Sequence, residues 1–325
     1  MRDPLSWSFP LGRLFGITVR VHILFPVFAA AFILRAVYLQ NKESYPPNLY
    51  VDVVLLMLIL FGSVLLHEFG HCVGARLVDG DAHDILLWPL GGLAYVEVPH
   101  KPRAHLIATA AGPITNLLIC LVSAVALWWA SGLEVRPPFN PFWYPYRMWF
   151  GGAGNQLAFA ELWKWNGEPY IAESMNAVVF LARVFWVNWV LFLLNMVLVG
   201  FPMDAGRLFQ CALWPWYGFR QATLAAIMMG FVTMIVITVC AIVANEVWPF
   251  LLAMFIYATC RQQWIILETG GEEGLFGYDF SQGYTSLEGD APPPRRKRPN
   301  LLKRWLQKRA ASMMTNIGRF RNVSM

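Results

Sequence analysis

The stretch His67-Glu68-Phe69-Gly70-His71 directly follows an apolar run over residues 53–66. On a helix, residues four positions apart differ by about 6 Å in rise and about 40° in rotation, so both imidazoles can reach one ion. Glu68 falls within the same arc of about 100°, beside a metal-bound water rather than on the metal. The spacing predicts a helix that carries His67 and His71 as metal ligands and Glu68 as a catalytic residue.

The apolar setting of this stretch strengthens the prediction. A charged residue at the centre of a membrane helix costs roughly 2.5 to 3.5 kcal/mol on insertion scales, so an intramembrane polar group points to a function. The alternative is that neighbouring helices satisfy the three polar side chains.

The composition places the whole chain in a membrane. Hydrophobic residues make up 57% of the 325 residues and charged residues 14%, with a mean hydropathy of +0.47. A soluble domain of this length does not show such values. We therefore predict a multi-pass membrane protein.

Six apolar runs are long enough to cross about 30 Å of hydrocarbon. They cover residues 21–39, 51–78, 104–130, 177–200, 222–244 and 247–267. The predicted fold class is all-α, with six transmembrane helices over residues 21–267. Residues 86–96 contain Pro89, Gly91 and Gly92 and then alternate in character, which predicts a short re-entrant β-hairpin. A plain cytoplasmic loop with hydrophobic anchors is the alternative.

Basic residues suggest the orientation. Nine Lys and Arg residues flank the spans on the side of the amino terminus, against four on the other side. The positive-inside rule then predicts that both termini lie in the cytoplasm. The expected location is the inner membrane of a bacterial cell.

The segments outside the spans have distinct compositions. Residues 1–20 are expected to form a cytoplasmic or interfacial segment, and residues 131–174 an aromatic interfacial lid. Residues 268–294, rich in Gly, Pro and acids, are typical of a flexible linker. Residues 295–325 alternate basic and apolar residues at helical spacing, which favours binding to an anionic inner leaflet. A solvated tail is the alternative, and no nucleic acid is expected as a partner.

Two histidines leave a metal ion short of a third protein ligand, and Asp204 is the best candidate. It follows a span that runs from outside to inside, as the His67 helix does. If that helix enters at about residue 53, Glu68 lies about 22 Å along it, within about 8 Å of the inner edge of the hydrocarbon. Asp204 ends its own span at the same side, so the two parts meet at a similar depth.

These motifs together resemble the site-2 protease family of intramembrane zinc metalloproteases. They are HEFGH from residue 67, Ala-Gly-Pro-Ile-Thr-Asn over residues 111–116, Trp-Pro-Leu-Gly-Gly over residues 88–92 and Phe-Pro-Met-Asp-Ala-Gly-Arg over residues 201–207. The resemblance is to the compact form without a PDZ domain, similar to a sporulation factor. It implies one Zn²⁺ held by His67, His71 and Asp204, and hydrolysis of the membrane segment of single-span proteins. A regulatory membrane partner is also expected.

The sequence departs from the family near the third ligand. The family usually has Asn eight residues before the Asp, and Met196 holds that place here, with Asn195 one residue earlier. In a continuous helix a shift of one residue turns a side chain by about 100°, which counts against a catalytic role for Asn195. The sequence leaves the role of Asn195 open. Asn116, on the third span, is expected to help stabilise the oxyanion as a second catalytic residue. The alternative for Gly112 and Asn116 is close helix packing with an interhelical hydrogen bond.

The predicted function is that of an intramembrane zinc endopeptidase. Zinc with three protein ligands keeps a place for a water whose pKa falls to about 7, and Glu68 would accept its proton. The rival hypothesis is a metal-binding membrane scaffold or transporter without catalysis. A transporter should show a polar path and paired half-repeats, and neither is evident in the sequence.

Overall fold

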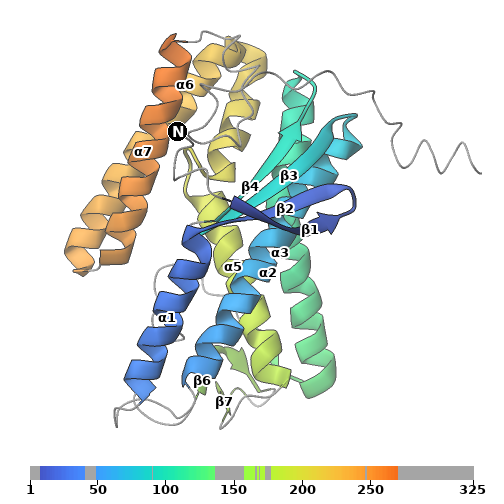
Figure 1. The fold of residues 1–325 in the computed structure, drawn as a ribbon, viewed down its shortest axis with the longest axis vertical. Helices are drawn as coiled ribbons and strands as arrows, with labels where there is room; N and C mark the ends of the chain where they lie inside the picture. The colour runs from blue at the N-terminus through green and yellow to red at the C-terminus, as the bar shows by residue number, and fades with distance from the viewer. Residues whose placement is uncertain are drawn as a thin grey trace, which may run out of the picture. The chain divides into compact units, whose positions relative to one another are not determined.

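The structure is a computed structural model that describes residues 8–40, 49–89, 91–135, 157–164, 167, 169–172, 177–245 and 247–269. Figure 1 shows the order of the elements along the chain. The helices are α1 (Leu24–Gln40), α2 (Leu49–Leu77), α3 (Pro102–Ser131), α5 (Ala177–Val197), α6 (Asp204–Ala244) and α7 (Val247–Thr269). The strands are β1 (Ser8–Leu14), β2 (Ile17–His22), β3 (Asp81–Trp88), β4 (Gly91–Glu97), β5 (Glu134–Val135), β6 (Leu157–Trp163) and β7 (Pro169–Ala172).

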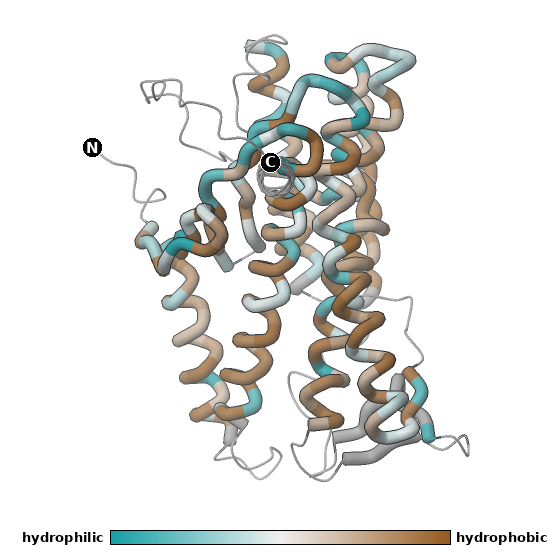
Figure 2. The backbone as a smooth tube through the Cα atoms, turned by 90° about the vertical axis from the view of Figure 1, so that its right-hand side faces the viewer, coloured by the Kyte–Doolittle hydropathy of each residue, from teal (hydrophilic) through white to brown (hydrophobic). Residues whose placement is uncertain are grey.

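Five helices of the described part are long and apolar enough to cross a membrane, namely α2, α3, α5, α6 and α7. Hydrophobic residues cover most of their length (Figure 2). The protein is therefore a multi-pass membrane protein. Helix α1 has 17 residues, about 26 Å at 1.5 Å per residue, which is shorter than the hydrocarbon layer. The count of six spans thus stays a prediction.

The fold is mostly helical, as predicted, but it is not all-α, because β1 to β4 form a four-stranded sheet in that order. Residues 17–22 alternate between buried and half-buried side chains up to Val21, and Ile17, Val19 and Val21 lie in the core. This period of two is typical of a strand with one covered face. Strand β2 pairs antiparallel with β1 and parallel with β3. The first helix accordingly begins at Leu24 and not at residue 21.

Strands β3 and β4 cover the segment predicted to form a re-entrant hairpin. They pair antiparallel, with Leu86 opposite Leu93 and Trp88 opposite Gly91. The depth of this pair in a membrane stays a prediction. In the sheet order β4 comes last, so its second edge is not paired with any strand of the described part.

Helix α6 contains more than the span predicted over residues 222–244. Gly218 has a φ of 78° and a ψ of 162°, which breaks the helix into two arms. Figure 1 shows the second arm running beside α7. The first arm begins at Asp204 and includes Pro215, and the pattern of apolar residues did not predict it. The two arms put Asp204 at the start of a helix rather than at the end of a span.

The remaining predictions concern loops and tails. Within residues 131–174, β5, β6 and β7 form a three-stranded sheet, while residues 136–156 lie outside the described ranges. Thr269 ends α7, so the linker predicted over 268–294 and the basic tail predicted over 295–325 lie almost entirely outside the described residues.

Close packing of α2 on α3 sets the position of the metal-binding motif. A Cβ atom on Gly70 would lie 2.4 Å from Thr115 Oγ1 and 2.6 Å from the Ala111 carbonyl oxygen. A Cβ atom on Gly74 would lie 2.7 Å from the Ala111 Cβ. Small residues allow helix backbones to approach closely in membranes. Helix α3 therefore lies directly against the face of α2 that carries His67 and His71.

Candidate metal centre

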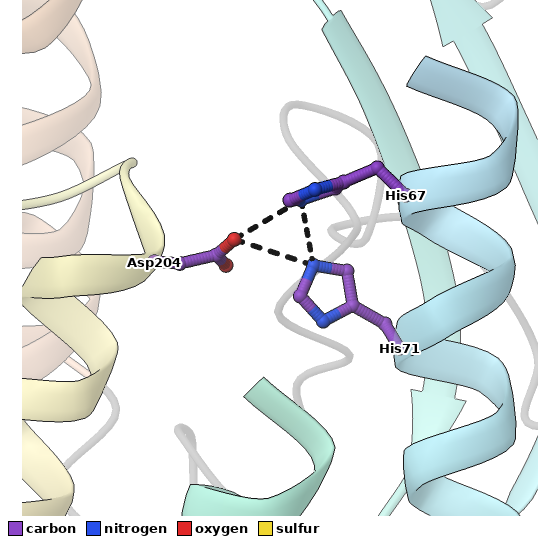
Figure 3. A group of neighbouring side chains, drawn as sticks. All are labelled: His67, His71 and Asp204. Carbon is purple, nitrogen blue, oxygen red and sulfur yellow. Dashed lines mark hydrogen bonds and ion pairs between the residues drawn. The ribbon is translucent and has the colours of Figure 1, made fainter. Parts of the chain in front are cut away.

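His67 and His71 project from α2 toward Asp204, which begins α6 (Figure 3). The Nε2 atoms of the two histidines are 3.1 Å apart. Asp204 Oδ2 lies 3.1 Å from His67 Nε2 and 3.4 Å from His71 Nε2. All three residues are buried, with at most 8% of each exposed. The structure thus brings together the three predicted ligands.

The donor triangle has the dimensions of a zinc site. Tetrahedral zinc bonds of about 2.0 to 2.1 Å place neighbouring donor atoms about 3.3 Å apart. The three edges here are 3.1, 3.1 and 3.4 Å. Asp204 Oδ2 is fully buried, and the only partners it has in the described part are the two imidazole nitrogens. Two imidazoles and a carboxylate are a set that zinc enzymes use, so the residues fit the ion.

Asp204 reaches the histidines because the chain changes direction just before it. Helix α5 ends at Val197 and α6 begins at Asp204, with six residues in a non-helical connection. Gly200, at a φ of 145°, lies so close to Gly230 that a Cβ atom would meet the Gly230 backbone at 2.2 Å. The connection is therefore anchored on the second arm of α6. A carboxylate in the first turn is also favoured by the helix dipole.

Helix α3 contacts the far nitrogen of each histidine. His71 Nδ1 lies 3.0 Å from the Ala108 carbonyl oxygen. His67 Nδ1 lies 3.1 Å from Asn116 Nδ2. A carbonyl can only accept, so His71 carries its proton on Nδ1 and presents the Nε2 lone pair to the triangle.

Gly112 lies between these two contacts and faces the donor atoms. A Cβ atom at this position would lie 2.4 Å from His71 Nε2 and 2.8 Å from His67 Nε2. Any side chain would enter the space of the ligands, so α3 can lie this close only with glycine.

A cavity of about 960 Å³ opens from the metal-binding group, and Glu68 lines it together with His67, His71 and Asp204. Strand β4 lines the cavity from Gly91 to Ala94. A Cβ atom on Gly92 would lie 2.4 Å from Glu68 Cγ, so this glycine lets β4 pass directly over the predicted base. In the sequence, the only indication of this close approach of β4 to Glu68 is the pair Gly91-Gly92.

Of the two asparagines discussed in the sequence, only one lines the cavity. Asn195 lines the cavity, and Asn116 is not among its lining residues. Asn195 would be turned away from the site only if one continuous helix ran up to Asp204. The residues between Val197 and Asp204 are not helical, so this connection absorbs the shift of one residue and Asn195 can line the cavity.

Three other histidines near α2 and α3 do not join the group. His83 lies 3.6 Å from Glu97 and 3.9 Å from Asp81, all on the exposed part of the sheet. His100 and His105 contact the ring of Trp214. In the described ranges, three His, Cys, Asp or Glu residues approach one another as metal ligands only at His67, His71 and Asp204.

The chain is similar to several known proteins. The model of peptidase family M50 matches residues 55–238. A zinc metalloprotease of Methanocaldococcus jannaschii is 23% identical over 270 residues, which cover 81% of this chain and 62% of the relative. Rip3 of Mycobacterium tuberculosis is 27% identical over 279 residues, which cover 81% of this chain and 59% of Rip3. The chain thus spans about three fifths of the length of these relatives.

A solved structure shares the fold. The site-2 protease from Methanocaldococcus jannaschii aligns with a TM-score of 0.50 and 22% identity, over 79% of this chain and 95% of that chain. The resemblance seen in the sequence motifs is confirmed by the family match, which covers more than half of the chain. The chain belongs to peptidase family M50, the site-2 protease family.

Proposed function

We propose that this protein is a zinc-dependent endopeptidase that cleaves peptide bonds inside the membrane. The observation that carries the proposal is the buried triangle of His67 Nε2, His71 Nε2 and Asp204 Oδ2, with Glu68 lining the same cavity. The triangle lies between α2 and α6, two of the helices that are long and apolar enough to cross a membrane. A buried ligand set with an acid beside it is the arrangement that metal-assisted hydrolysis needs.

In the proposed hydrolysis, each of these residues has its own role. A zinc ion on the three ligands would supply a Lewis acid and an acidified water. Glu68 accepts the proton of the attacking water and passes it to the leaving amine. The Asn195 amide lines the same cavity and donates one N–H to the Leu191 carbonyl oxygen at 3.1 Å, and its second N–H can donate to the oxyanion of the substrate.

The open edge of β4 supports a mode of substrate binding. A helical substrate hides its peptide bonds and must become extended before attack. An extended segment can add to the unpaired edge of β4, because the backbone groups of that edge supply hydrogen bonds that lipid cannot. We propose the membrane segment of a single-span protein as the substrate. Its release from the membrane would be a step of regulated intramembrane proteolysis.

The proposed setting is the inner membrane, with both termini in the cytoplasm. The basic tail over residues 295–325 would bind the anionic inner leaflet, and a regulatory membrane partner would control access. Antibody or protease accessibility of terminal tags in right-side-out and inverted vesicles tests the orientation.

The central experiment uses the purified full chain in detergent, with a tagged single-span protein as substrate. The wild type should contain one zinc per chain by elemental analysis and should cleave the substrate. Glu68→Gln should retain zinc and lose cleavage, because it keeps the shape of the side chain and removes the base. The matched control is Glu268→Gln, since Glu268 is exposed at the end of α7.

Two outcomes would overturn the proposal. A wild type that binds no zinc removes the metal centre. A Glu68→Gln variant with wild-type cleavage excludes Glu68 as the catalytic base, and a metal-binding scaffold or transporter then explains the site better.

A further inference from the structure

Asn116 is a buried polar residue that lies outside the lining of the cavity. None of its surface is exposed, and it is not among the residues that line the cavity. Its Oδ1 atom is buried and has no hydrogen-bond partner in the described part of the chain. Burying an amide atom without a hydrogen-bond partner costs free energy, so a buried asparagine of this kind needs an explanation. The contact of Asn116 with a metal-binding histidine offers one.

That contact is with the far side of the His67 ring. Asn116 Nδ2 lies 3.1 Å from His67 Nδ1, while His67 Nε2 belongs to the donor triangle. The amide therefore acts on the imidazole from behind, at the nitrogen that points away from the metal-binding group. A donor to the oxyanion would have to reach the cavity instead, and Asn195 does so.

The chemistry of a metal-bound imidazole determines what Asn116 must offer. A neutral imidazole that gives its Nε2 lone pair to a metal carries its proton on Nδ1, and this N–H needs an acceptor. Asn116 carries one acceptor and two donors on a planar amide, and a half turn of the amide exchanges Oδ1 and Nδ2. After this turn Oδ1 occupies the place beside His67 Nδ1. The atom that now lacks a partner becomes the acceptor that the ligand requires.

His71, the second histidine, already has an acceptor oxygen beside its Nδ1 atom. His71 Nδ1 lies 3.0 Å from the Ala108 carbonyl oxygen, which is on the same helix. Helix α3 would thus provide both imidazoles with an acceptor, one from the backbone and one from a side chain. In metal sites such outer partners fix the ring and the tautomer, and their loss typically lowers metal affinity about 10- to 100-fold.

We infer that Asn116 is a positioning residue of the metal centre, which holds His67 with its proton on Nδ1 and its Nε2 lone pair toward Asp204 and His71. This inference rests on the proposed function, because it assumes that the triangle binds zinc. It replaces the role in oxyanion binding that the sequence suggested for Asn116.

The experiment measures the zinc dissociation constant of the full chain in detergent, by competition with a chelating indicator. Asn116→Leu keeps the approximate size of the side chain and removes the acceptor, so the Kd should rise about 10- to 100-fold. Asn116→Asp keeps an acceptor oxygen and removes the donors, so the Kd should stay at or below the wild-type value. Asn116→Ala also lacks the acceptor and should resemble Asn116→Leu, which covers the case that leucine prevents folding.

Asn188 provides a matched control. It is also fully buried, but it donates to Ser63 Oγ at 2.9 Å and to the Val184 carbonyl oxygen at 2.8 Å. Asn188→Leu should lower thermal stability and leave the zinc Kd unchanged. An equal rise of the Kd in Asn188→Leu would mean that any lost buried asparagine weakens the site, and would overturn the inference.

The remaining outcomes separate the inference from its rivals. An unchanged zinc Kd in Asn116→Leu overturns it. If the Kd is unchanged and both Asn116→Leu and Asn116→Asp lose turnover, Asn116 is a donor to the substrate instead. If the wild type itself binds no zinc, the proposed function fails. If the wild type and the Asn116 variants bind zinc equally well, only the inference about Asn116 fails.

Discussion

Replacing Gly112 by alanine adds one methyl group to α3 at the point where this helix faces the donor triangle. The added carbon would lie 2.4 Å from His71 Cε1 and Nε2 and 2.8 Å from His67 Nε2. Contacts between carbon and other heavy atoms are most favourable at about 3.5 to 4.0 Å, so the histidine or the helix must move by about 1 Å. Zinc sites tolerate deviations of about 0.2 Å in a bond. We therefore expect His71 to be lost as a ligand.

The size of the effect follows from this displacement. Loss of a direct ligand should exceed the effect of losing an outer partner, so the zinc Kd should rise at least about 100-fold, or about 2.8 kcal/mol. Alanine is the better helix former by about 1 kcal/mol in soluble helices, so a weaker helix cannot be the cause. Titration with a chelating indicator gives the Kd, and thermal unfolding in detergent tests the fold.

Gly62→Ala is the matched control, because Gly62 also lies within an apolar helix but has no atom within 4 Å of the position that the added methyl group would take. This variant should keep the wild-type zinc Kd. The steric reasoning is refuted if Gly112→Ala binds zinc as tightly as the wild type, or if both alanine variants lose zinc equally.

Four further predictions concern the cavity, the fold and the metal. Gly92→Val should lower cleavage at least about tenfold without loss of zinc, since the side chain would displace the base by about 1 Å; Gly12→Val, at an open strand position, is the control, and equal turnover of the two would contradict the role of β4. Asn195→Leu should lower kcat by about 100- to 1,000-fold at an unchanged zinc Kd; an unchanged kcat would exclude it from oxyanion binding. Asp52→Asn should lower the free energy of unfolding by about 1 to 3 kcal/mol, because it leaves the buried Arg183 guanidinium without its carboxylate partner at 3.1 Å. This loss is smaller than for a fully buried pair. Adding Arg183→Leu should recover part of it, and strictly additive losses would contradict the pairing. Removal of zinc with a chelator should abolish cleavage, and zinc alone should restore it; full activity after verified removal would exclude metal catalysis.

The sequence predicted the helices best where apolar residues continue without interruption. The spans expected over 51–78 and 104–130 agree with α2 and α3 within two residues at each end. The first arm of α6 was not predicted because Asp204, Arg207 and Pro215 interrupt its apolar pattern. Strand β2 was missed because its alternating residues 17–22 adjoin the apolar start of α1, and a window for membrane spans merges the two.

For the site, the HEFGH spacing was enough to place two ligands, since a helix fixes the relation between residues four apart. The third ligand required a contact between α2 and α6, which only the matching depth of two spans suggested. The places of Asn116 and Asn195 depend on the non-helical connection before Asp204 and on the packing of α3. Spacing along one chain does not contain such information about a neighbouring helix.

The position of Asp204 at the start of α6, opposite two histidines of α2, has a consequence for the lifetime of the folded chain. An ion held by all three cross-links segments that are far apart in sequence, and the unfolded chain cannot hold it in the same way. Ligand binding of this kind adds a free energy of RT ln(1 + [Zn]/Kd), about 2.7 kcal/mol when free zinc exceeds the Kd 100-fold. Scarcity of zinc would then shorten the survival of the protein as well as slow its turnover.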